Sequence, residues 1–158
     1  LRDGENLSLG DETIHVLDTP GHTNCSTTYI LEPASIMFTS ESTGVLEGEG
    51  SIHGAVLKSY LDARASFERC KAYGAKQLIS PHYGMVPTYY TDAYWTLYEQ
   101  KLDEEQAFIQ DMYDHNLSES EMVKRFADRY WAEERAQEQP LEAFLLNAKN
   151  TIKAAKNS

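Results

Sequence analysis

Short runs of alternating apolar and polar residues dominate the first part of the chain. The alternation predicts strands at residues 6–9, 13–17 and 27–31. A more continuously apolar run predicts a buried strand at 35–39, and a last short strand is expected at 77–80. Gly, Asp and Pro residues separate the first four runs, as is typical of turns between strands. The pattern therefore indicates a sheet.

A different pattern fills the gap between the fourth and fifth of these strands. Four glycines within residues 44–54 predict a mobile loop. From about Ala55 to Tyr73, apolar residues recur at helical spacing, and Gly74 is a favourable stop for a helix. We therefore expect one helix to connect the fourth strand to the fifth.

The last part of the chain predicts helices only. Thr91 is placed to cap the first, and Ser118 with Glu121 forms a capping box for the second. Pro140 suits the first turn of a third helix. The tyrosine-rich stretch 89–98 is interpreted as packing between these helices and the sheet.

The change of pattern near Pro87 predicts two parts. Residues 1–87 read as a mixed α/β unit and residues 88–158 as a helical extension of about three helices. With 158 residues, the chain can hold one domain, or one compact half with an appendage.

Composition narrows the classes of partner. The chain carries 25 acidic against 14 basic residues, a net charge of −11. This balance argues against nucleic acid and anionic membranes as partners, because both need Lys and Arg. No apolar run approaches the ~20 residues that span a bilayer. The first residues lack both an initiator Met and a signal-peptide core, so we expect the chain to begin inside a longer protein.

Two cysteines, Cys25 and Cys70, form neither a metal-type pair nor a disulfide framework. Free thiols suit a reducing compartment, so we expect a cytoplasmic protein. Cys25 lies three residues after His22, which leaves a thiolate ligand as one reading. A small buried residue is the simpler one.

Two short motifs carry the candidate chemistry. Thr19-Pro20-Gly21-His22-Thr23 and Pro81-His82-Tyr83-Gly84 each place a histidine at the end of a strand, beside Pro or Gly. The apolar run from Ile36 ends in the carboxylate of Glu41. Two histidines and a carboxylate at the ends of three strands are a typical ligand set for a divalent metal ion.

The order and the flanking residues of these motifs resemble the C-terminal half of the metallo-β-lactamase-fold hydrolases. The resemblance covers roughly residues 3–87 and implies half of a four-layer αββα fold. It assigns His22 to a first metal ion, His82 to a second and Glu41 to the position of the aspartate between them. The His-x-His-x-Asp-His run of that family is missing, so the chain holds only part of a two-metal site.

Several roles stay open at this stage. Glu41 is one methylene longer than the family's aspartate. It could bridge two ions, bind one, contact the ligands without binding metal, or be a solvated loop acid. Tyr83 is a candidate catalytic residue that would hydrogen-bond a developing oxyanion, with an aromatic lid or core residue as the alternative. We expect no function for His15, His53 and His115, although contact of His53 with substrate is an alternative. The acidic run 103–105 is interpreted as a solvated helix face.

The resemblance implies the C-terminal fragment of a metal-dependent hydrolase acting on a small-molecule substrate. Zn²⁺ is the expected cofactor, as one or two ions, with Fe or Mn as alternatives. The metal would activate a water molecule for attack on an ester, thioester, lactam or phosphoester. We expect the fragment alone to be inactive, and the sequence identifies no substrate-binding residue.

Two other functions remain compatible with the sequence. One is a non-catalytic interaction or dimerisation module, and the other is an oxidoreductase of the diiron branch of the same fold. A half-fold would expose one face of its sheet. We therefore expect a homo-oligomer formed through the sheet or the C-terminal helices, unless those helices fold back over the exposed face.

Overall fold

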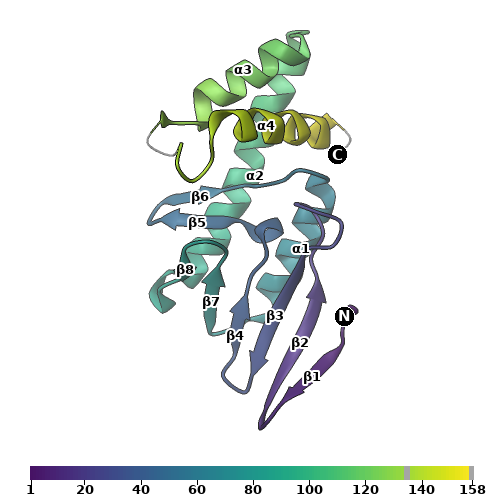
Figure 1. Cartoon of the computed structure of the whole chain (residues 1–158), viewed down its shortest axis with the longest axis vertical. Coiled ribbons are helices and arrows are strands. Elements are labelled where there is room, and N and C mark those ends of the chain that lie inside the picture. Colours follow the sequence, from purple (N-terminus) through teal and green to yellow (C-terminus); the bar gives the residue numbers. More distant parts are fainter. Residues whose placement is uncertain (134–135, 157–158) are drawn as a thin grey trace.

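The computed structural model describes residues 1–133 and 136–156. Six strands form one sheet in the order β1-β2-β3-β4-β7-β8 (Figure 1). Neighbouring strands are antiparallel except β4 and β7, which are parallel and are joined through a helix. Their bounds are β1 Asn6–Leu9, β2 Glu12–Asp18, β3 Thr27–Glu32, β4 Ile36–Phe38, β7 Gln77–Ser80 and β8 Gly84–Met85. The strands expected from the alternation are thus all present.

The glycine-rich segment is a hairpin, and the expectation of a loop there is wrong. Strands β5 (Val45–Gly48) and β6 (Ser51–His53) pair antiparallel. The apolar side chains of this segment are buried, and Gly50, with a φ of 77°, provides the turn between its strands. Burial of the apolar side chains therefore outweighs the low strand propensity of glycine here.

The helix after the hairpin, α1, spans Tyr60–Tyr73 and begins later than the expected Ala55. Ala55 has a φ of 51°, which a right-handed helix cannot contain. The side chain of Ser59 caps the helix by accepting a hydrogen bond from the backbone of Asp62. Gly74, in the left-handed conformation, ends the helix as the sequence predicts.

Three helices make up the extension: α2 (Thr91–Asp114), α3 (Glu119–Tyr130) and α4 (Leu141–Lys156). The capping box of Ser118 and Glu121 is present at the start of α3. The predicted cap by Thr91 is wrong, because a 3₁₀ turn (Thr88–Tyr90) leads into α2 and places Thr91 inside its first turn. The Thr91 hydroxyl is buried and has no hydrogen-bond partner in the described part of the chain.

Helix α2 belongs to both hydrophobic cores of the molecule. Its first half packs with α1 against one face of the sheet, through residues such as Tyr94, Tyr98 and Leu102. Its second half packs with α3 and α4 through Ile109 and Met112. The division at Pro87 stays a prediction, since α2, which begins after it, packs on the sheet as well as on α3 and α4.

The other face of the sheet is open toward the viewer in Figure 1. Phe38 on β4 and Met85 on β8 are 44% and 71% exposed. The helices that follow Pro87 do not fold back over this face, since α2 packs on the opposite side and α3 and α4 lie beyond the end of the sheet (Figure 1). Within the described residues, no helix has the length and hydrophobicity needed to cross a membrane.

Candidate functional site

The loop after β2 holds His22 between η1 (Glu41–Thr43), the 3₁₀ turn that follows β4, and the start of α1. A Cβ atom at Gly21 would lie 2.7 Å from the Cα of Ala63, so only glycine lets the loop pass this close to the helix. The backbone N–H of His22 donates to the hydroxyl of Ser42 at 2.9 Å. The Pro-Gly-His motif therefore fixes the histidine through its backbone.

Glu41 is the first residue of η1. The N–H of Gly44 donates to the Glu41 carbonyl at 3.1 Å, which closes this short turn. Two buried tyrosines of α2 bind the carbonyls that follow. The hydroxyl of Tyr98 donates to the Ser42 carbonyl at 2.7 Å, and the hydroxyl of Tyr94 lies 3.0 and 2.8 Å from the carbonyls of Thr43 and Gly44.

His82 lies in the turn between β7 and β8 and has a φ of 65°. Residues with a side chain rarely adopt this left-handed conformation, and histidine tolerates it better than most. The N–H of Tyr83 donates to the Pro81 carbonyl at 2.7 Å across the turn. Backbone strain of this kind is typical of functional sites, where it directs a side chain toward a ligand.

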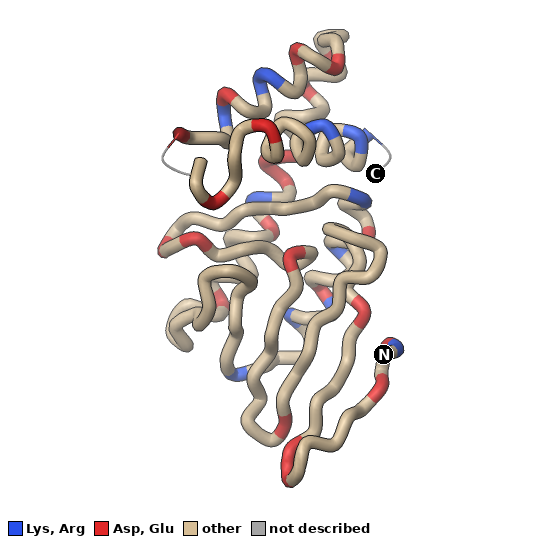
Figure 2. Tube along the Cα trace, viewed as in Figure 1, with Lys and Arg blue, Asp and Glu red and all other residues tan. Residues whose placement is uncertain are grey.

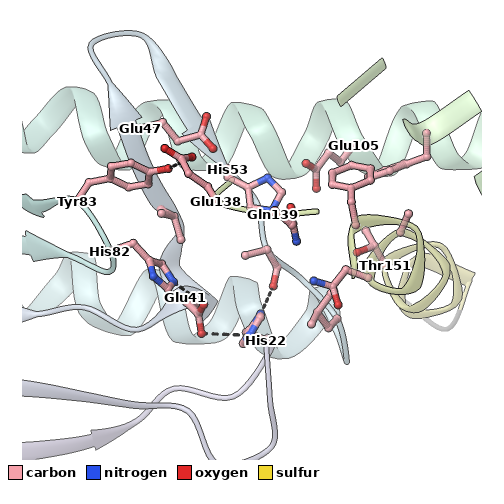
Figure 3. Close-up of a pocket in the computed structure, with 17 residues that line it drawn as sticks. His22, Glu41, Glu47, His53, His82, Tyr83, Glu105, Glu138, Gln139 and Thr151 are labelled. Carbon is pink, nitrogen blue, oxygen red and sulfur yellow. Dashed lines mark hydrogen bonds and ion pairs between the residues drawn. The ribbon is translucent and has the colours of Figure 1, made fainter. Parts of the chain in front are cut away.

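These three side chains meet at one carboxylate (Figure 3). The Nε2 atom of His22 is 3.1 Å from Oε2 of Glu41, and the Nε2 atom of His82 is 2.9 Å from Oε1. His22 is 18% exposed and His82 is 62% exposed. The structure thus brings together the three residues that the motifs single out, with one histidine at each oxygen.

The proton on His22 can be placed from its other contact. Its Nδ1 atom is 2.6 Å from the carbonyl oxygen of Ala55, which can only accept, so Nδ1 carries the proton. In the neutral imidazole, Nε2 then presents a lone pair to the carboxylate of Glu41. That contact is favourable only with a proton or a cation between the two atoms, and a fixed Nδ1–H is how proteins orient a metal-binding histidine.

The three side chains do not surround a single point. Within the described residues, no group of three or more His, Cys, Asp or Glu side chains is placed to hold a metal ion. His22 and His82 contact different oxygens of Glu41. The arrangement therefore fits a carboxylate between two positions, each with one histidine, better than one complete position.

A cavity of about 470 Å³ extends from this cluster to the helical extension. Its described lining comes from the cluster, the hairpin and the helices. The residues are His22, Glu41, Val45, Glu47, His53, Ala55, Leu57, His82, Tyr83, Glu105, Phe126, Glu138, Gln139, Phe144, Asn147, Ala148 and Thr151. The volume is that of a small-molecule site.

Tyr83 lies at the wall of this cavity and is 45% exposed. Its hydroxyl donates to Oε2 of Glu138 at 2.6 Å (Figure 3). Glu138 precedes α4, so this bond ties the turn of His82 to the helical extension. The oxyanion role of Tyr83 stays a prediction.

The structure also places residues that the sequence did not single out. His53, for which we expected no function, lines the cavity. The interpretation of residues 103–105 as a solvated face is wrong for Glu105, which is 2% exposed. The signal was its spacing, since Glu105 lies between Leu102 and Ile109 on the apolar side of α2. Cys25, the alternative thiolate ligand, is exposed and does not line the described part of the cavity.

Charge around the cluster favours a cation. Between Arg2 and Lys58 the sequence contains no Lys or Arg, and the strands of this segment carry only acidic charges in Figure 2. Four glutamates, Glu41, Glu47, Glu105 and Glu138, line the cavity. A divalent cation would therefore enter a region of negative potential.

Comparison with known proteins supports the fold. No family model matches the sequence, and no curated protein matches it. The fold is similar to that of an archaeal metallo-β-lactamase superfamily protein from Sulfolobus tokodaii, with a TM-score of 0.58 and 16% identity over 100% of this chain and 51% of that one. It is also similar to a metallo-β-lactamase family protein from Thermus thermophilus, with a TM-score of 0.57 and 18% identity over 99% of this chain and 47% of that one.

The chain thus spans about half the length of these structures. The expectation of a partial metallo-β-lactamase fold is confirmed at the level of the fold. At these identities the likeness carries no information about activity.

Proposed function

We propose that this chain supplies the C-terminal half of the active site of a metal-dependent hydrolase. The observation that carries the proposal is the placement of two imidazole Nε2 atoms against the two oxygens of Glu41, at the edge of a cavity. Nothing in the packing of the sheet requires two histidines to meet there. Their meeting at one carboxylate supports two neighbouring ligand positions, each with one histidine and one oxygen of Glu41.

The donor set fits a divalent metal ion. We infer that His22 and His82 would each ligate through Nε2, and that Glu41 would offer one oxygen toward each histidine. Imidazole and carboxylate donors suit Zn²⁺, and they also suit Fe and Mn. When bound, such an ion lowers the pKa of a water molecule and polarises the bond to be cleaved.

In this proposal, other parts of the chain orient the three ligand residues. The carbonyl of Ala55 holds His22 in the tautomer that leaves Nε2 free to bind. The turn η1 fixes the backbone of Glu41, and the turn after β7 directs His82 toward it. Since each position receives only one histidine from this chain, the remaining ligands must come from a second segment. That segment would complete the fold whose other half the compared structures contain.

The proposed reaction is hydrolysis of an ester, thioester, lactam or phosphoester in a small molecule. The test uses the intact protein that carries this chain, purified without added metal and then loaded with Zn²⁺. Metal content is measured, and hydrolysis is followed with 4-nitrophenyl acetate, a thioester and bis(4-nitrophenyl) phosphate.

We expect His22→Ala to lower both metal content and activity. His115→Ala is the matched control, because His115 is exposed at the end of α2 and takes no part in the cluster. Unchanged metal content in His22→Ala would overturn the proposed ligand. Metal binding without hydrolysis of any substrate would overturn the proposed reaction.

A further inference from the structure

A buried carboxylate lies in the wall of the cavity away from the histidine cluster. Glu105 of α2 is 2% exposed and still lines the cavity. Figure 3 places it with Thr151 on the helical side, apart from Glu41 and His82. Phe126, Phe144 and Ala148 supply apolar surface on this side of the cavity.

The bonding of Glu105 is incomplete. The hydroxyl of Tyr60 donates to Oε2 at 3.1 Å. The ammonium of Lys101 lies 3.6 Å from Oε1, which is long for a hydrogen bond. A carboxylate can accept about four hydrogen bonds. Against the larger effect of burial, the Lys101 ammonium lowers the pKa of Glu105 through its charge and a long hydrogen bond, so Oε1 is weakly satisfied and can accept a further donor.

Burial of the Glu105 carboxyl group lowers the stability of the fold. Burial raises the pKa of Glu105, because the charged form loses its hydration. A Cβ atom at residue 54 would come within 2.5 Å of Oε2, so Gly54 leaves space for the carboxylate. A well-packed apolar side chain would be at least as stable in such a place. A buried, perturbed carboxyl group in a cavity wall is instead typical of a functional site.

Two neighbouring polar groups are also open. Thr151 of α4 lies on this side in Figure 3 and is 6% exposed, and Asn147, one turn earlier on the same face of α4, also lines the cavity. Neither side chain has a hydrogen-bond partner among the described residues. Their polar atoms remain accessible from the cavity. A few convergent polar groups on an apolar surface are what a specific small-molecule site presents.

We propose that Glu105, Asn147 and Thr151 form a specificity subsite for an uncharged amide group of the substrate. The amide N–H would donate to Oε1 of Glu105, and its carbonyl would accept from the side chains on α4. An ammonium group fits less well, because Lys101 already places a positive charge beside the carboxylate. A carboxylate or phosphate would face Glu105 directly and be repelled.

This assignment rests on the proposed hydrolase function only where hydrolysis is measured. Ligand binding to the metal-free protein tests the subsite independently. Three 4-nitrophenyl hexanoate esters serve as substrates, differing only in a terminal acetamido, propyl or carboxylate group. On the intact zinc-loaded protein we expect kcat/KM for the acetamido ester to exceed that for the propyl ester by about tenfold, the lower end of what a hydrogen bond to a charged group contributes. The carboxylate ester should be the poorest substrate.

Two variants test the residues. Thr151→Val keeps the size of the side chain and removes its hydroxyl, and Glu105→Gln removes the charge. Each should reduce the acetamido-to-propyl ratio severalfold. Tyr113→Phe is the matched control, because it removes a tyrosine hydroxyl bound to the Ile152 carbonyl on the same helix. That control should leave the ratio unchanged.

Titration of N-acetyl-6-aminohexanamide into the metal-free protein provides the second measurement, and its affinity should fall in Thr151→Val. Hydrolysis of all three esters without preference would overturn the subsite and leave the hydrolase proposal standing. Binding that depends on Thr151 without hydrolysis would support the subsite and count against the hydrolase. A ratio equal in Thr151→Val, Glu105→Gln and the control would also overturn the subsite.

Discussion

Removing the hydroxyl of Tyr98 should weaken the candidate metal site without changing any ligand. Tyr98 lies on α2, and its hydroxyl donates to the carbonyl of Ser42, the residue after Glu41. The ring also fills the space beside Gly44, where a Cβ atom would lie 2.5 Å from it. Tyr98 therefore determines how the turn that carries Glu41 lies against the helix.

The expected magnitude follows from the geometry. Tyr98 is fully buried, so Tyr98→Phe leaves the Ser42 carbonyl without its donor and without water. Such a loss costs about 1–3 kcal/mol of the free energy of unfolding. For a chain of this length, each kcal/mol lowers the melting temperature by about 2–4 °C. Tyr94→Phe should cost less at each carbonyl, because one hydroxyl proton is shared between Thr43 and Gly44.

The effect on metal binding separates positioning from stability. Groups that orient ligands typically change metal affinity by about 10–100-fold, so we expect at least a tenfold loss of Zn²⁺ affinity in Tyr98→Phe. The assay is competition with a chromophoric chelator on the intact protein, with Co²⁺ absorption as a report on ligand geometry. Tyr113→Phe loses the same kind of tyrosine–carbonyl bond far from the cluster and should lose stability only.

The reasoning would be refuted by a Tyr98→Phe protein that is destabilised as expected but binds Zn²⁺ as tightly as the unaltered protein, with the same Co²⁺ spectrum. Tyr98 would then be a packing residue and no more. Equal losses of affinity in Tyr98→Phe and Tyr113→Phe would likewise show that stability alone governs metal binding.

Four further outcomes are expected. This chain alone should bind Zn²⁺ in the micromolar range or more weakly in calorimetry, because it supplies few ligands; nanomolar affinity abolished by His22→Ala would contradict that. His82→Gly should match or exceed the unaltered chain in urea stability by up to about 1 kcal/mol, since glycine relieves the positive φ, while His82→Ala should not. Light scattering should show that the chain associates through its open sheet face, at ~25 cal/mol per Å² of apolar surface buried, and that Phe38→Lys reduces this; a monomer at all concentrations would exclude it. Because burial raises the folded-state pKa of Glu105 above its ordinary 4.5, the folded state keeps the proton to higher pH than the unfolded state, and stability should fall as pH rises from 4.5 through the folded pKa. Glu105→Gln should lack this part of the decline, and parallel pH curves for the two proteins would contradict it.

Local patterns predicted the parts of the fold that local forces determine. The strands at 6–9, 13–17 and 27–31 follow from alternation, and the start of α3 follows from its capping box. The start of α1 does not follow from a local pattern. The backbone of Ala55 is left-handed, and its carbonyl accepts a hydrogen bond from His22, a residue distant in the sequence. A sequence window cannot contain a partner that lies 33 positions away.

The same distinction applies to the site. His22, Glu41 and His82 could be found because each stands in a short motif at the end of a strand. The spacing of Glu105 between Leu102 and Ile109 indicates that it is buried, but its contacts with Tyr60 and Gly54 follow only from the packing of α2. The interpretation of the stretch 89–98 as packing is confirmed for Tyr94 and Tyr98 and wrong for Tyr89, which is 76% exposed. The bonds of Tyr94 and Tyr98 to the turn of Glu41 follow only from the path of the helix.

These contacts make the helical extension a part of the site rather than an appendage. Helix α2 holds the turn of Glu41 through Tyr98 near its start and presents Glu105 to the cavity farther along. The segment before α4 binds Tyr83, the residue after His82, through Glu138. A shift of α2 relative to the sheet would therefore move a candidate metal ligand and the proposed amide subsite together. Under the two proposals above, α2 would set the distance between Glu41 and Glu105, and substrates of a different length should lose the benefit of the subsite even when both of their ends are correct.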